Sequence, residues 1–148
     1  MTSKEFEHTM IHSYSAASLD APDRLFQLTH ASRTRTQLWL QADAAPSIGI
    51  NHRLEILFQN VQYVCSPFAL RGLSLRRATQ DESGRLSKLH GLEVDPDYSI
   101  YLLSRSHTWF IVSAKPIWAE ADLSYNDKPV FYSYTGREDV VISMGTIE

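Results

Sequence analysis

The feature that most constrains the fold is a long series of short segments after residue 35 in which apolar residues alternate with polar ones. Alternation with a period of two is typical of β-strands that bury one face. Two segments, 98–103 and 108–114, are especially rich in aromatic and branched residues, which favour a pleated surface. Because the connections are too short for the crossovers that parallel strands require, the sequence predicts an antiparallel sheet.

The alternation predicts nine strands and one change of face between them. The apolar residues Leu54, Ile56 and Phe58 are out of phase with Val61, which predicts a bulge or tight turn at Asn60. We therefore predict a mainly β protein of the α+β class, built as an antiparallel β-sandwich or open barrel. The predicted strands are 37–42, 54–58, 61–65, 73–75, 98–103, 108–114, 117–122, 129–134 and 139–144.

One short helix is predicted at about 80–90, inserted between two strands. Thr79 and Glu82 have the spacing of a capping box, in which each side chain binds the backbone amide of the other residue. Gly91 suits the left-handed conformation in which many helices end. Leu86 and Leu89 supply apolar side chains for one face of this helix.

The first thirty residues lack the strand pattern and are predicted to be helical or irregular. Phe6 and Met10 lie one helical turn apart, which predicts a short helix that packs on the sheet. Asp20 is a candidate N-cap for a second short helix, because Pro22 is tolerated in a first turn and Leu25 begins an apolar face.

Length and composition predict one globular domain. The chain has 148 residues, of which 43% are hydrophobic and 21% are charged. We predict a single domain, 1–148, in which residues 1–34 pack on or flank a β-rich body at 35–148. No segment approaches the ~20 apolar residues of a membrane-spanning helix, and residues 1–8 are too acidic for a signal peptide. The predicted location is the cytoplasm, with no membrane partner.

Charge and cysteine content narrow the possible partners. A net charge of −3 argues against nucleic-acid binding, which draws on a surplus of Lys and Arg. The single cysteine, Cys65, excludes an internal disulfide and favours a reducing compartment. Charge is nevertheless segregated, because residues 71–90 hold five basic and two acidic side chains, whereas 91–97 hold three acidic side chains and no base. Such segregation suits an interface with another protein.

No residue pattern specifies a catalytic or metal centre. His8 and His12 have the spacing of metal ligands on a helix, but a third ligand is not evident. Cys65 lies in an apolar run that fits a buried thiol better than a nucleophile. The six glycines are scattered singly, so no phosphate-binding loop is indicated. We predict no catalytic residue, no metal and no cofactor.

Aromatic residues are the best candidates for a binding role. In a regular strand Trp109 and Phe110 point to opposite faces, as do Phe131 and Tyr132, so one member of each pair must leave the main core. Tyrosine and tryptophan are enriched where an apolar surface meets a polar rim. The predicted binding residues are Arg71, Arg76, Arg77, Tyr101, Trp109, Trp118 and Tyr132.

Three hypotheses of function follow. The first is a non-enzymatic protein that acts by protein–protein contact, either by self-association, such as a homodimer, or as an inhibitor, immunity or adaptor protein. The second is a small-molecule-binding or sensing barrel or sandwich, with an aromatic-lined pocket and an arginine for an anionic or aromatic ligand. The third is an enzyme of unfamiliar type that uses dispersed residues such as His90, His107, Glu120 or Asp122.

One stretch near the C-terminus has a resemblance to a known family. It consists of Asp127-Lys128-Pro129-Val130-Phe131-Tyr132-Ser133, followed by Arg137-Glu138-Asp139. It resembles the closing strands of the ligand-sensing domains attached to some bacterial transcription regulators. The stretch lacks the glycine usual in that turn, and no helix-turn-helix pattern precedes it. No residue role is carried over from the resemblance.

Overall fold

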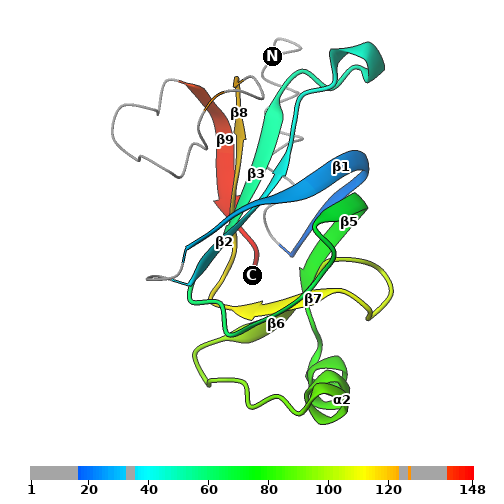
Figure 1. The fold of residues 1–148 in the computed structure, drawn as a ribbon, viewed down its shortest axis with the longest axis vertical. Coiled ribbons are helices and arrows are strands. Elements are labelled where there is room, and N and C mark those ends of the chain that lie inside the picture. The colour runs from blue at the N-terminus through cyan, green and yellow to red at the C-terminus, as the bar shows by residue number, and fades with distance from the viewer. Residues whose placement is uncertain (1–16, 33–35, 124–126, 128–139) are drawn as a thin grey trace.

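The computed structural model describes residues 17–32, 36–123, 127 and 140–148. Within them the strands form one antiparallel sheet in the order β4-β7-β6-β5-β1-β2-β3-β8-β9 (Figure 1). The predicted mainly β, antiparallel class is therefore confirmed, and the sheet is open, with β4 and β9 at its edges. The elements are β1 Ser18–Ser32, β2 Gln37–Ala42, the 3-10 helix η2 Pro46–Ile48, β3 Arg53–Phe58, β4 Tyr63–Cys65, β5 Ala69–Arg77, α2 Gln80–His90, β6 Ser99–Leu102, β7 Phe110–Ser113, β8 Ile117–Ala121 and β9 Val141–Thr146.

The sheet must curl strongly, because short links join strands that are far apart in its order. Strands β7 and β8 lie six positions apart, which in a flat sheet is about 29 Å. The link between them, 114–116, can span at most about 14 Å. At this corner the Ala114 amide donates to the Gln59 carbonyl at 3.0 Å, and the Gln62 amide donates to the Val112 carbonyl at 2.8 Å. These two bonds lie between two strand pairings, that of β3 with β8 and that of β4 with β7, and connect them.

The main core lies on the inner face of this curled sheet. It receives buried side chains from β1, β2, β3, β5, β6, β7 and β8. Leu38, Leu40 and Ala42, which share one face of β2, are all part of it, as are Trp118 and Phe26. Because one face of each of these strands points into the curl, period-two alternation in the sequence corresponds to the inner and outer faces.

The outer face carries two smaller apolar clusters. One packs under α2 and includes Phe110, Ile100 and Leu86. The other lies on the outer side of β2, β3 and β8. Trp109 packs against the main core, whereas Phe110 lies in the cluster under α2. The prediction that one member of this aromatic pair leaves the main core is therefore confirmed, and a second covered face is the reason.

The predicted helix is confirmed as α2. Thr79 Oγ1 accepts from the Glu82 amide at 3.2 Å, and the Glu82 carboxylate accepts from the Thr79 amide at 2.9 Å. Gly91 follows in the left-handed conformation with φ of 66°. Leu86 is buried, but Leu89 is 76% exposed, so the prediction that both pack on one apolar face is wrong. The cluster is completed instead by residues after the helix, Leu92 among them.

The predicted second helix, with Asp20 as its N-cap, is wrong. Residues 18–32 form β1, which pairs with β5 on one side and β2 on the other, so they lie inside the sheet rather than flanking it. The pairing of β1 with β5 shifts register between Ala21 and Leu25. This irregularity interrupts the alternation, and Pro22, which cannot donate to a ladder, lies within it. The predicted helix at Phe6 and Met10 lies outside the described residues.

The remaining strand predictions are confirmed wherever the structure describes them. The last strand, predicted at 139–144, is β9, Val141–Thr146. The predicted strand 129–134 lies outside the described residues. Asn60, where a bulge or turn was predicted, has a φ of 52° and lies in the link between β3 and β4. The side chains therefore change from one face of the sheet to the other at Asn60, in the link where the chain passes from β3 to β4.

We expect Gly72→Ala to lower the free energy of unfolding by about 2 kcal/mol. Gly72 has a φ of 82°, and a Cβ atom there would lie 2.9 Å from the Pro22 carbonyl oxygen. Gly84→Ala is the matched control, because Gly84 lies in α2 with nothing within 4 Å of the added carbon. That change should raise stability by up to about 1 kcal/mol. Urea denaturation measures both, and a loss of similar size in the two variants would contradict this account.

Candidate functional site

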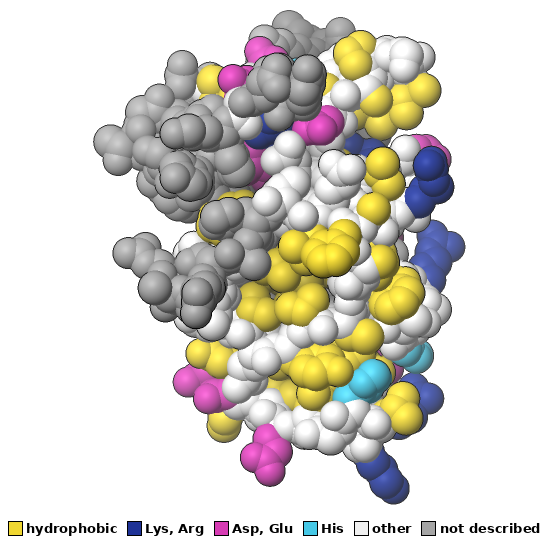
Figure 2. Space-filling view, viewed as in Figure 1, with side chains coloured by type: hydrophobic (Ala, Val, Ile, Leu, Met, Phe, Trp, Pro, Cys, Tyr) yellow, Lys and Arg dark blue, Asp and Glu magenta, His cyan; other side chains and the backbone are white. Residues whose placement is uncertain are grey.

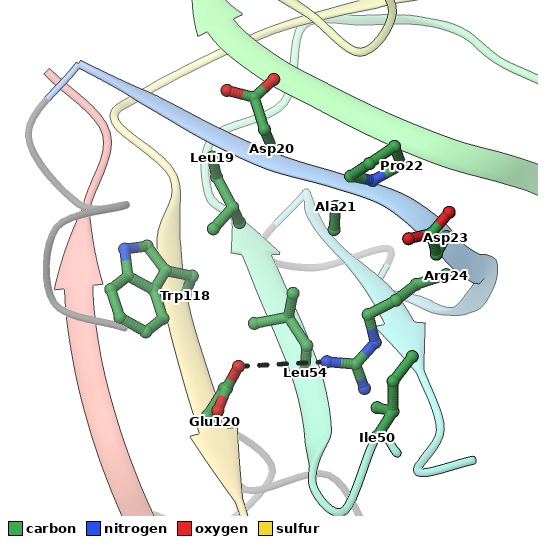
Figure 3. Close-up of a pocket in the computed structure, with 10 residues that line it drawn as sticks. All are labelled: Leu19, Asp20, Ala21, Pro22, Asp23, Arg24, Ile50, Leu54, Trp118 and Glu120. Atoms are coloured by element: carbon green, nitrogen blue, oxygen red, sulfur yellow. Dashed lines mark ion pairs between the residues drawn. The ribbon is translucent and has the colours of Figure 1, made fainter. Parts of the chain in front are cut away.

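A pocket of about 190 Å³ opens between β1, β3 and β8 (Figure 3). Its walls are partly apolar and partly polar. The apolar side chains are Leu19, Ala21, Pro22, Ile50, Leu54 and Trp118, and the charged ones are Asp20, Asp23, Arg24 and Glu120. Figure 3 shows Arg24 and Glu120 pointing toward one another across its polar end. The pocket therefore combines apolar side chains with one arginine and three carboxylates.

Arg24 is fixed in place by the ends of two strands. Its Nη2 donates to the carbonyl oxygens of Ala42 at 3.0 Å and Asp43 at 3.3 Å, and also to that of His52. Its Nη1 lies 3.9 Å from Oε1 of Glu120, which is an ion pair but too long for a hydrogen bond. The side chain is only 10% exposed, and this burial lowers the pKa of Arg24. Attraction to the Glu120 and Asp43 carboxylates acts in the opposite direction but is the smaller effect. Nη1 is therefore a desolvated donor at the pocket.

Trp118 forms one wall of the pocket. Its side chain is fully buried, and its Nε1 makes no hydrogen bond to any residue that the structure describes. Figure 3 shows this nitrogen on the side of the ring away from Arg24. The pocket is thus bounded here by the carbon part of the side chain.

A second polar cluster joins α2 to the sheet. The Glu82 carboxylate accepts from both terminal nitrogens of Arg76, each at 2.7 Å, and His107 Nε2 also contacts it. The hydrogen bonds from Arg76 and the Thr79 amide hold the pKa of Glu82 far below its ordinary value of 4.5. The same pairing raises the pKa of Arg76. Arg76, predicted as a binding residue, therefore has a structural partner.

The predicted aromatic binding residues do not line one pocket. Trp118 borders the Arg24 pocket, whereas Tyr101 is buried in the main core, where burial raises its pKa. Trp109 is half-buried against that core. Tyr132 lies outside the described residues. A pocket lined by all four is therefore not found in the described part of the chain.

The predicted arginines are also separated. Arg77 is exposed beside a shallow groove along α2, and Arg71 is exposed on β5. The arginine that does reach a pocket is Arg24, which sequence reasoning missed. Arg24 lies in the irregular part of β1. Apolar and polar residues do not alternate regularly there, so the sequence did not indicate which side chains face inward.

The dispersed residues of the enzyme hypothesis do not share a cleft. His90 packs on the rings of Phe110 and Tyr63, with centroids 5.0 and 6.0 Å apart. His107 lies at Glu82, and Glu120 lies in the Arg24 pocket. Across residues 17–32, 36–123, 127 and 140–148, no three His, Cys, Asp or Glu side chains gather as a metal site would require. In the same ranges no helix has the length and apolar character needed to cross a membrane.

An exposed surface of mixed apolar and polar side chains lies on the outer side of the β1–β5 pair. Leu25 is opposite Arg71 and Gln27 is opposite Ala69, so these four side chains share a face. All four are exposed, and the adjacent Phe68 is 81% exposed. We call these five residues the β1–β5 surface. Separately from this surface, Figure 2 shows hydrophobic side chains gathered on the part of one face that lies over β6 and β7 in Figure 1.

Phe68 was also missed from the sequence. It follows Ser66 and Pro67 in the connection before β5, outside any predicted strand. What could have indicated its exposure from the sequence was its position, an aromatic residue directly after a proline in a connection between strands. The carbonyl of Phe68 accepts from the Leu28 amide at 2.8 Å, which fixes the backbone while the ring faces solvent.

Comparisons with protein-family models, curated proteins and solved structures find no match to this chain. The class of protein is therefore defined by the fold alone: a mainly β protein with one curled antiparallel sheet and one described α-helix capped by Thr79 and Glu82. Its function must be argued from its pocket and its surface.

Proposed function

We propose that the protein acts by binding a partner protein through the β1–β5 surface. The observation that carries this proposal is Phe68, a large aromatic side chain that is 81% exposed, next to a face that contains Leu25 at 44%. Interfaces draw most of their affinity from a few aromatic or arginine side chains near their centre. Phe68 and Arg71 are residues of these types, both exposed and three positions apart in the chain.

The charge of this region supports an acidic partner. Arg71 is exposed on β5 and lies opposite the exposed Leu25 of β1. Opposite charges across an interface steer encounter and disfavour wrong partners. We therefore propose a partner with an apolar pocket for Phe68 and carboxylates around it, as expected for an inhibitor, immunity or adaptor role.

The cytoplasm is the proposed location. The chain has one cysteine, Cys65, which cannot form a disulfide within it, and such a composition fits a reducing compartment. Self-association through the same surface is the second form of this proposal. A homodimer would place two copies of Phe68 in one symmetric interface.

Affinity capture with the wild-type chain and two surface variants tests this proposal. Phe68→Asp should weaken binding of a stoichiometric partner at least about 30-fold, as loss of an aromatic anchor costs about 2 kcal/mol or more. Ile48→Asp is the matched control, because Ile48 is 62% exposed in η2 and is not one of the five residues of the β1–β5 surface. It should bind as the wild type does.

Native mass spectrometry completes the test. A species at twice the 16.9 kDa chain mass that is lost in Phe68→Asp and kept in Ile48→Asp would support self-association. Arg71→Glu should weaken binding of an acidic partner, and the wild-type affinity should fall as salt is added. A bound partner that is equally retained by Phe68→Asp and the wild type would overturn the proposal.

A further inference from the structure

We propose that two copies of this chain pair through α2, with α2 of each copy against the acidic connection that follows α2 in the other copy. This goes beyond the proposed partner binding, because it uses no residue of the β1–β5 surface. Figure 1 shows α2 at one end of the molecule, beside the connection that leads from it to β6. Each copy can therefore present both elements to a second copy about one two-fold axis.

The exposed face of α2 is basic and carries one apolar side chain. Arg85, Lys88 and Leu89 lie within about one helical turn of each other, and all three are exposed, Leu89 at 76%. We call these three residues the α2 basic face. The side chains of Arg85 and Lys88 make no ion pair or hydrogen bond with any residue that the structure describes. Asp81, the exposed carboxylate of the same helix, lies in the first turn, away from Lys88 in the last.

The connection after α2 is acidic. Glu93, Asp95 and Asp97 are all exposed, and residues 91–97 contain no base. We call these three residues the acidic turn. Its backbone is held in place, because the Asp95 amide donates to the Gln62 side chain at 3.1 Å and the Asp95 carboxylate accepts from the Asp97 amide at 3.0 Å. None of its three carboxylates forms an ion pair within the described part of the chain.

The two surfaces are complementary between copies rather than within one copy. At the lower end of the face in Figure 2, Lys and Arg side chains protrude to the right and Asp and Glu side chains to the left. Figure 1 places α2 and the connection after it on these same two sides. A two-fold axis between them sets each α2 basic face against the acidic turn of the other copy and brings both copies of Leu89 into the interface. A second copy is the partner that satisfies both charged surfaces at once.

Sedimentation equilibrium tests the dimer. The wild-type chain should show a reversible monomer–dimer equilibrium that shifts toward monomer as salt is added, because salt screens exposed charges. Reversal of the helix charges, Arg85→Glu with Lys88→Glu, should weaken the dimer at least about tenfold. Reversal of the turn charges, Glu93→Lys with Asp97→Lys, should do the same. A wild-type chain that stays monomeric at its highest soluble concentration would overturn the proposal.

A mixture of the two charge-reversed chains is the sharper test. In a mixed dimer the reversed helix of one chain faces the reversed turn of the other, and the two unchanged surfaces face each other. Both contacts are then attractive, whereas both are repulsive in each variant alone. Native mass spectrometry should therefore show a one-to-one heterodimer from two chains that are monomeric when separate. Absence of that heterodimer would contradict the pairing of these surfaces.

Single variants separate this dimer from the proposed function. Leu89→Ser should weaken the dimer about tenfold or more, since an apolar contact is lost from the interface. Ile48→Ser is the matched control, because Ile48 is 62% exposed in η2 and belongs to neither surface. Phe68→Asp should keep this dimer even where it abolishes partner capture. A dimer that is lost in Phe68→Asp and kept in Leu89→Ser would overturn the assignment to α2, so the two proposals fail in different experiments.

Discussion

Replacing Glu55 by alanine is expected to lower the free energy of unfolding by about 3–5 kcal/mol. Glu55 and Arg53 lie on the outer side of β3, both with 0% side-chain exposure, and their charged atoms are 3.2 Å apart. Arg53 also lies 3.7 Å from the Asp43 carboxylate and donates to the Asp127 carbonyl at 3.0 Å. Removal of Glu55 leaves a buried guanidinium with less compensation. Urea denaturation at neutral pH measures the loss.

A double variant separates this pairing from simple loss of packing. Arg53→Met combined with Glu55→Leu removes both charges and keeps most of the volume, so it should lose less stability than Glu55→Ala alone. The exposed pair Lys115–Glu148, with nitrogen and oxygen 3.0 Å apart and both side chains more than half exposed, is the matched control. Glu148→Ala should cost less than about 1 kcal/mol. If the double variant were the least stable of all, the charges would not be coupled as described.

Glu82→Gln is expected to lower the free energy of unfolding at pH 7 by roughly 2–3 kcal/mol, because hydrogen bonds to a charged group are lost. The folded protein holds the pKa of Glu82 far below the ordinary value of 4.5, through Arg76 first and the Thr79 amide second. A carboxyl with a depressed pKa stabilises the fold fully above its unfolded pKa. That contribution is lost as pH falls below about 4.5 toward the folded value.

The test of this prediction is the difference in stability between wild type and Glu82→Gln from pH 7 to pH 3. The difference should be largest above pH 5 and should shrink steadily below it. Asp81→Asn is the matched control, because Asp81 lies in the same first turn of α2 and is exposed. That variant should change stability little at either pH. A difference for Glu82→Gln that stays constant across the range would show that the carboxylate does not act through its charge.

Some of these features could be read from the sequence because they depend on neighbours along the chain. The capping of α2 needs only Thr79, Glu82 and Gly91 at fixed spacing, and the structure has all three in these roles. The inward faces of β2 and β3 follow from period-two alternation, since successive side chains of a strand point to opposite sides. Such local patterns predicted the mainly β class, the antiparallel pairing and the single inserted helix.

The residues of a binding site were harder to predict from the sequence, because they depend on which strands lie next to one another in the sheet. Trp118 was selected for its type and does border a pocket, but its polar neighbour is Arg24 rather than any arginine of 71–77. Arg76 was selected for its charge, which is used to hold Glu82. Residue type identifies side chains that can bind, whereas their partners depend on strand order.

The sequence by itself determined the element types, most strand positions and the helix caps, because propensity, alternation and capping act over a few residues. Only the tertiary structure decided that residues 18–32 form a central strand, since their pairing with β5 and β2 outweighs a broken local pattern. It also decided that Arg53 and Glu55 are buried together and that Phe68 is left exposed. These outcomes depend on the curl of the sheet, which brings together residues far apart in the chain and cannot be read from any short segment.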